Sequence, residues 1–222
     1  MLLQVLFSGL ALGSIYGLVA LGFAVVFKAT EVFNFAQGMF VVCGAYLVVT
    51  GITSLQLPFA LAILFMVVGA GLIGILIHKF LIQPLSGQPM LAVIMLTIAL
   101  SIALRALIEI IYGSQGLTLN TPLPNGVFKI GELRISQLHL TAAVVSWGCM
   151  AVFGAFFRYT SIGLLMRATA DGHEAAVVSG INVNVMNRLA WAIGCILAAI
   201  GGLFLGQLQI VSTELETIGL LA

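Results

Sequence analysis

Charged residues are scarce in this sequence. Of its 222 residues only 7% are Asp, Glu, Lys or Arg, whereas a soluble globular domain carries ~25%. So few charges cannot cover a water-soluble surface, because large apolar patches would then face water. The formal net charge of +1 also excludes the clustered positive charge with which proteins bind phosphates. We therefore expect no nucleic-acid partner.

Cysteine is sparse, and metal-binding spacings are lacking. Cys43, Cys149 and Cys195 lie inside apolar runs, where cysteine acts as a small packing residue, and no C-x-x-C pair occurs. His173 begins a stretch like H-E-x-x-H, but Val177 stands where the second histidine is needed. We expect neither a metal nor another cofactor.

Nucleotide-hydrolysis and acyl-transfer signatures are absent too. No glycine directly precedes a lysine, which excludes the phosphate-binding motif G-x-x-x-x-G-K-[ST], and no G-x-S-x-G occurs. The chain is therefore expected not to be an enzyme, and not to hydrolyse ATP by itself.

Long apolar runs, by contrast, fill the sequence, which is 62% hydrophobic. A helix needs ~20 apolar residues to cross a bilayer, and helix is the expected form because the hydrocarbon offers no water to the backbone. The candidate spans are residues 4–27, 38–54, 58–77, 91–112, 139–157 and 188–208. We predict an all-α polytopic transmembrane helix bundle of about six spans, in a single domain over residues 1–222.

Two details of these spans stay open. The second span is short and follows Asn34 and Gln37, so both a full crossing and a broken or re-entrant helix fit it. In the fourth, Arg105 and Glu109 share one helix face, where they can pair, reach the interface or serve a function.

Lysine and arginine counts predict the orientation. Lys129 and Arg134 fall in the loops on one side, whereas five basic residues fall in the loops on the other side. These five are Lys28, Lys79, Arg158, Arg167 and Arg188. The side with five is predicted to be cytoplasmic, which puts the N-terminus outside.

Small residues recur every four positions in the first and last spans, which allows close helix packing in lipid. The stripes contain Gly9, Gly13 and Gly17, and Gly194, Ala198 and Gly202. We interpret both as helix-packing faces, with a substrate-lining role as the alternative.

Two segments outside the spans are long. The outer one, 113–138, predicts a small hairpin from 128–130 and 133–135, either as a connector or as a docking surface. The inner one, 158–188, predicts two short amphipathic coupling helices with a bend at Asp171-Gly172 and an end at Gly180. These helices either lie on the membrane or face a soluble partner.

Several motifs resemble those of the permease subunits of branched-chain amino acid ABC transporters, over nearly the whole chain. They are the runs Gly13–Gly22, Asn34-Phe35-Ala36-Gln37-Gly38, Gly44-Ala45-Tyr46, Phe157–Gly163, Arg167-Ala168, Gly180-Ile181-Asn182 and Gly194–Gln207. The wider importer signature E-A-A-x-x-x-G is matched in its first half only, because Ala190-Trp191-Ala192-Ile193 replaces the later Ile-x-Leu-Pro.

The resemblance implies one permease of an importer in the bacterial inner membrane. Such a permease works with a second related permease, two cytoplasmic ATPase subunits and a periplasmic substrate-binding protein. It further implies an ATPase-coupling loop with Arg167, Asp171, Glu174, Ala175, Ala176 and Gly180. Asn34, Gln37 and Gly38 are then candidates for the translocation path, with helix capping at the cytoplasmic edge as the alternative.

Other interpretations remain at this stage. A related permease for urea or short amides fits the same motifs, and so does a membrane scaffold subunit that does not transport. Family members are longer, and residues 217–222 resemble the start of a further helix. We therefore expect the sequence to be incomplete at its C-terminus.

Overall fold

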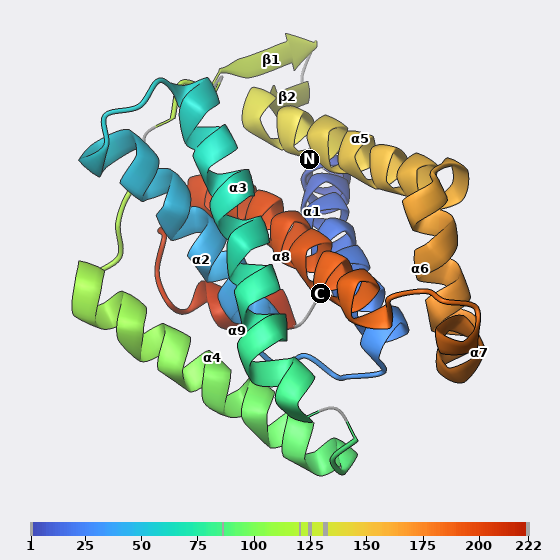
Figure 1. The fold of residues 1–222 in the computed structure, drawn as a ribbon. Helices are drawn as coiled ribbons and strands as arrows, with labels where there is room; N and C mark the ends of the chain where they lie inside the picture. The colour runs from blue at the N-terminus through green and yellow to red at the C-terminus, as the bar shows by residue number, and fades with distance from the viewer. Residues whose placement is uncertain (1, 86, 120, 124–125, 131–132, 221–222) are drawn as a thin grey trace.

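The computed structural model describes residues 2–85, 87–119, 121–123, 126–130 and 133–220. Its elements are α1 (Leu2–Thr30), α2 (Gln37–Val49), α3 (Phe59–Ile77), α4 (Met90–Tyr112), β1 (Val127–Ile130), β2 (Leu133–Ser136), α5 (Gln137–Tyr159), α6 (Ser161–Asp171), α7 (His173–Val178), α8 (Val183–Leu208) and α9 (Leu215–Leu220). Figure 1 shows a helical bundle, as the apolar runs predict.

Within the described residues, six helical segments are long and apolar enough to cross a membrane. They run over Gln4–Thr30, Gln37–Ser54, Phe59–Leu85, Met90–Tyr112, Gln137–Tyr159 and Val183–Leu208. The predicted spans are confirmed, with two boundaries misplaced. The third continues through His78 and Lys79 by a π-helical turn, and the last begins at Val183 because Asn182 caps it. Polar residues at a helix end obscure such boundaries.

Helix α8 is the central element of the bundle, with α1, α2 and α3 packed around it (Figure 1). Small residues allow this crowding. A Cβ on Gly22 would lie 2.9 Å from the backbone oxygen of Gly194, and one on Gly202 would collide with the backbone of Val41. The small residues of the last span therefore lie where helix backbones meet, which is the geometry that favours association in lipid.

The stripe in α1 behaves differently from the one in α8. No described atom lies within 4 Å of a Cβ built on Gly9 or Gly13, and Gly17 makes only an ordinary contact with Met150. Helix packing through these three glycines stays a prediction.

The second candidate span is a broken segment. Residues 31–36 form no helix, and α2 begins only at Gln37, whose Nε2 donates to the backbone oxygen of Val19 at 3.5 Å. Val19 lies eleven residues before the end of α1 at Thr30, or ~16 Å along the helix axis. Six non-helical residues can reach ~20 Å. The chain therefore re-enters the bundle before α2 forms, and the helix then continues through a π-helical turn, Thr50–Ser54.

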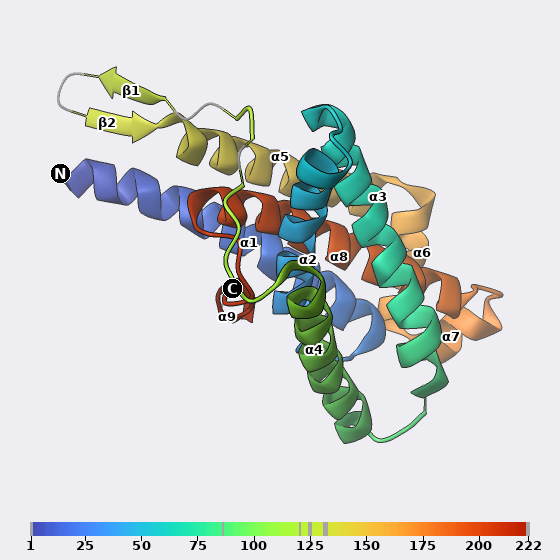
Figure 2. The ribbon, with the colours of Figure 1, turned by 90° about the vertical axis from the view of Figure 1, so that its left-hand side faces the viewer.

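The two ends of the bundle carry the predicted extra elements. Strands β1 and β2 pair antiparallel, with Phe128 opposite Ile135, and thus confirm the hairpin; its tip, 131–132, lies outside the described residues. Helices α6 and α7 confirm the two short helices predicted within residues 158–188. Figure 2 shows the hairpin beside the N-terminal end of α1, whereas α7 lies at the opposite end of the molecule.

Candidate functional site

The corner between α5 and α6 is built by a capping residue and a glycine. Thr160 ends α5 and caps α6, because its Oγ1 accepts a hydrogen bond from the backbone nitrogen of Gly163 at 3.0 Å. A Cβ on Gly163 would lie 2.6 Å from the backbone oxygens of Phe156 and Phe157. Only glycine fits so close to the preceding helix, so α6 is held at a fixed angle below α5.

A second corner joins α7 to α8. Gly180 has φ +80°, its nitrogen donates to Val177 O at 3.0 Å, and the nitrogen of Ile181 donates to Ala176 O at 3.0 Å. This is the Schellman arrangement that ends a helix on a left-handed residue. Two residues later, Asn182 Oδ1 accepts from the nitrogen of Val185 at 3.3 Å and starts α8. The short Gly-Ile-Asn run therefore couples α7 rigidly to the central helix.

The predicted coupling residues form part of one surface at this end. Ala175 is exposed on α7 whereas Ala176 is buried against the bundle, so the two alanines do not form a single outward face. The exposed apolar surface continues instead through Val177 and Val178, the latter 89% exposed. The amphipathic pattern of the sequence includes Val178, but it does not distinguish either valine as a contact residue. The backbone of Glu174 lies in α7, and its side chain falls outside the described set.

Two further coupling residues flank this surface. The Arg167 guanidinium donates from Nη2 to the backbone oxygen of Arg158 at 3.3 Å and lies over the ring of Phe157. Asp171 is exposed at the end of α6, directly before the break at Gly172. Arg167 thus braces the α5–α6 corner, and Asp171 stands at the hinge between α6 and α7.

The predicted path residues lie deep in the bundle. Asn34 and Gln37 are 0% and 1% exposed. Asn34 Oδ1 accepts from the nitrogen of Ala36 at 3.1 Å, and its Nδ2 donates to Gln37 Oε1 at 3.2 Å. The N-cap position of α2 is Ala36, without a side-chain cap, so the alternative of capping at the cytoplasmic edge is wrong. Both side chains instead fold the turn from which α2 starts in the interior.

Thr97 on α4 supports the same turn from the other side. Its hydroxyl is buried, accepts from the backbone nitrogen of Phe35 at 3.3 Å and lies 3.4 Å from the oxygen of Phe33. Non-helical backbone is tolerated at membrane depth only where protein or water satisfies it. Sequence reasoning missed Thr97, because nothing local connects it to a segment 62 residues away.

Gly38 marks the contact between α2 and the last described helix. A Cβ on Gly38 would collide with the backbone of Glu216, and one on Gly219 would lie 2.8 Å from the Cα of Gly38. Helix α9 therefore crosses the start of α2 in backbone contact. A role of Asn34, Gln37 and Gly38 in a path stays a prediction.

A charged cluster joins α9 to α4. Arg105 Nε and Glu109 Oε1 lie 3.1 Å apart, so the pair suggested by their spacing forms. Glu216 hydrogen-bonds to Ser101 and lies with Oε2 at 3.9 Å from Arg105 Nη1, and Thr213 donates to Glu109 at 3.2 Å. This cluster fastens the 213–216 segment to the outer half of α4.

Among the described residues, no group of three or more His, Cys, Asp or Glu side chains converges as a metal site would require. The notable features are instead a broken membrane span and a pair of short helices at one end. A broken span is a feature of proteins that move a solute across a membrane.

The sequence comparisons decide the family. Residues 5–221 match the family described as "Branched-chain amino acid transport system / permease component". The chain belongs to this family. The resemblance of the sequence motifs is thereby confirmed, and the protein is a multi-pass membrane permease.

Individual relatives carry the same description. LivH of Salmonella typhimurium is 28% identical over 218 residues, and LivH of Escherichia coli K12 and BraD of Pseudomonas aeruginosa are each 29% identical. All three are called high-affinity branched-chain amino acid transport system permease proteins. Each match covers 92% of this chain and 70 or 71% of the relative. No solved structure matches the permease.

Proposed function

We propose that this permease is a membrane subunit of an ATP-driven importer for branched-chain amino acids, and that it forms part of the translocation path in a bacterial inner membrane. The observation that carries the proposal is the α6–α7 pair, presented at one end of a bundle that matches the family over residues 5–221. The names of the relatives supply the substrate class, and their bacterial origin supplies the membrane.

The partners follow from what the subunit needs. Its sequence has no phosphate-binding loop, so two cytoplasmic ATPase subunits supply the energy and the chain itself is no enzyme. A second related permease completes the passage between the subunits, and a periplasmic binding protein delivers the substrate. The outer segment 113–138, with its projecting hairpin, is the surface on which that protein docks (Figure 2).

Coupling runs through α7. Ala175, Val177 and Val178 offer the ATPase an exposed apolar face. Because Gly180 and Asn182 join α7 to α8 through fixed turns, a displacement of α7 moves the central helix, around which α1, α2 and α3 are packed. This is the rigid-body type of switching by which small movements at one site alter a whole bundle.

The substrate path passes the start of α2. Non-helical backbone and the N-terminus of a helix meet there at mid-bundle depth, beside Asn34, Gln37 and Gly38. The positive end of a helix dipole attracts a carboxylate, and broken helices in other transporters place such ends at the substrate. An amino-acid carboxylate is therefore expected to pass this point.

Uptake by the complete importer tests the proposal. The permease is reconstituted in vesicles with its neighbouring permease, ATPase and binding-protein gene products, and the uptake of labelled leucine, urea and acetamide is compared. We expect ATP-dependent leucine uptake that disappears when this chain is omitted. Uptake of urea or acetamide instead would assign a different substrate, and leucine uptake that persists without the chain would make it a scaffold.

A further inference from the structure

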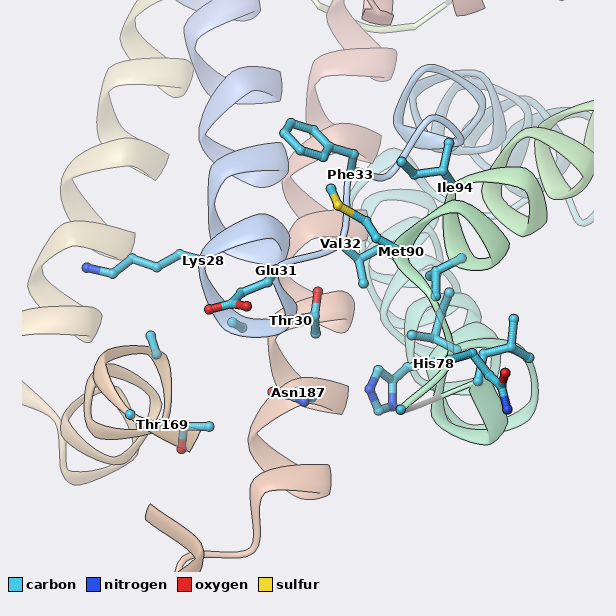
Figure 3. Close-up of a pocket in the computed structure, with 18 of the residues that line it drawn as sticks. Lys28, Thr30, Glu31, Val32, Phe33, His78, Met90, Ile94, Thr169 and Asn187 are labelled. Atoms are coloured by element: carbon cyan, nitrogen blue, oxygen red, sulfur yellow. The ribbon is translucent and has the colours of Figure 1, made fainter. Parts of the chain in front are cut away.

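A cavity of about 430 Å³ lies at the end of the bundle that carries α6 and α7. It is bounded by the ends of α1 and α3, the start of α4, the α6–α7 hinge and the first turns of α8 (Figure 3). Its volume falls in the ~300–1,000 Å³ range of small-molecule sites. Neither the path residues nor the exposed face of α7 belongs to its lining, so it is a separate feature of the permease.

The lining divides by chemistry. Figure 3 shows Thr30, Glu31 and Thr169 toward α1 and α6, and Val32, Met90 and Ile94 toward α4. A site with one polar and one apolar wall suits a small molecule with a polar head and an apolar tail.

Charges of both signs surround the polar wall. Lys28, Glu31 and Asp171 all line the cavity, and among the described residues none of the three takes part in an ion pair. Two carboxylates attract an ammonium group and one ammonium attracts a carboxylate. This combination matches a zwitterion better than a simple anion or cation.

Glu31 holds its place at a conformational cost. It follows α1 with φ 55°, and its nitrogen donates to Phe27 O at 2.7 Å, so it occupies the left-handed position after a helix that glycine normally takes. A non-glycine residue there is strained by ~1 kcal/mol or more. Glycine would relieve this strain but has no side chain, whereas Glu31 places a carboxylate at the cavity.

Unpartnered polar atoms also line the cavity at the end of α3 and the start of α8. His78 is 2% exposed, and within the described chain its Nδ1 has no hydrogen-bond partner; the same holds for Oδ1 of Asn187. In Figure 3 the His78 ring points across the cavity toward Asn187. A buried polar atom without a partner costs ~1–3 kcal/mol, which a bound polar ligand recovers.

We propose that this cavity binds a free amino acid with an apolar side chain on the inner face of the membrane, and that the bound product slows its own import. The inference rests on the proposed function for the identity of the product. The α-ammonium group meets Glu31, Asp171 and the acceptor atoms Oδ1 of Asn187 and Nδ1 of His78, the carboxylate meets Lys28, and the apolar tail lies against α4.

Inhibition follows from the position of the cavity. Residues 169–172 form one wall and contain the hinge between α6 and α7, whereas the other walls belong to the membrane spans. A ligand that binds both sides resists their relative movement. Because α7 couples the ATPases to α8, the restrained hinge lowers the rate of transport.

Direct binding provides the first test. The purified importer in nanodiscs, without ATP or binding protein, is titrated with labelled L-leucine, isoamylamine and isovalerate. We expect leucine to bind more tightly than the amine or the acid, which each lack one charged group. Glu31→Gln should weaken leucine binding about tenfold, whereas Glu214→Gln, an exposed carboxylate outside the cavity, should not change it. Equal binding to both variants overturns the assignment.

Transport provides the second test. Vesicles are loaded with leucine, and the ratio of ATPase rates with and without internal leucine is measured. We expect internal leucine to lower the wild-type rate several-fold, and Glu31→Gln to bring the ratio back toward one. If the importer takes up leucine but internal leucine neither binds nor slows it, this inference fails alone; if no leucine is taken up, the proposed function fails.

Discussion

At the scale of single residues, the motifs that mark the family are mainly devices for turning the chain. Gly163 and Gly180 allow two tight corners, Asn182 starts α8, and Asn34 shapes the turn before α2. None of the four is an exposed residue within a regular helix. Their common role is to fix where helices begin and end, which is what coupling through rigid elements requires.

Gly180 gives a direct test of this role. In Gly180→Ala a methyl group enters a left-handed conformation, which should destabilise the α7–α8 corner by ~1–2 kcal/mol and lower the thermal stability of the purified permease. Gly172→Ala is the matched control, because Gly172 has φ −172° and a Cβ there meets only Ala175 at 3.6 Å. Equal stability of the two variants would show that the left-handed turn does not form.

Thr97 makes the corresponding prediction inside the membrane. Thr97→Val keeps the shape but removes the hydroxyl that accepts from Phe35, and a buried donor left unpaired should cost ~1–3 kcal/mol. Thr53→Val removes only a bond to the backbone of its own helix at an exposed position, and should cost less. The midpoints of thermal unfolding in detergent check the difference, and matching midpoints would argue against the Thr97 contact.

At the scale of elements, the sequence predicts helices well and their interruptions poorly. Each span is a long apolar run, and a bilayer leaves such a run one stable form. The break at 31–36 has no such local cause. Its partners are Val19 and Thr97, in two other helices, and the tie between Ser101 and Glu216 joins residues 115 apart. Only the packed bundle brings these polar groups together.

The coupling helix carries a prediction at this scale. Val178→Asp places a charge on the exposed apolar end of α7 and should lower substrate-stimulated ATPase activity about tenfold, because it weakens docking by ~1.4 kcal/mol. Membrane insertion should be unaffected, since the side chain is solvent-facing. Leu55→Asp, an exposed apolar position after the π-helical turn that ends the second span, is the control and should keep full stimulation. Full stimulation in Val178→Asp would remove α7 from the coupling contact.

At the scale of the whole molecule, the alternation of spans brings the predicted basic residues to one end. Lys28 ends α1, Arg158 ends α5 and Arg188 begins α8, where its Nη2 donates to Gln83 at 3.0 Å. The same end carries the α6–α7 pair and the cavity. The basic residues, the proposed coupling surface and the proposed product site therefore share one face, and the orientation of this face in the cell determines whether the proposed mechanism is import.

Cysteine labelling in intact cells decides that orientation. In a background with Cys43, Cys149 and Cys195 replaced by alanine, Ser114→Cys and Ser179→Cys each offer one exposed thiol at opposite ends. A membrane-impermeant maleimide should label the first in whole cells and the second only after the cells are opened, because the positive loops stay in the cytoplasm. The reverse pattern would put α7 outside, where no ATPase could reach it, and would overturn the coupling role and the proposed product site together.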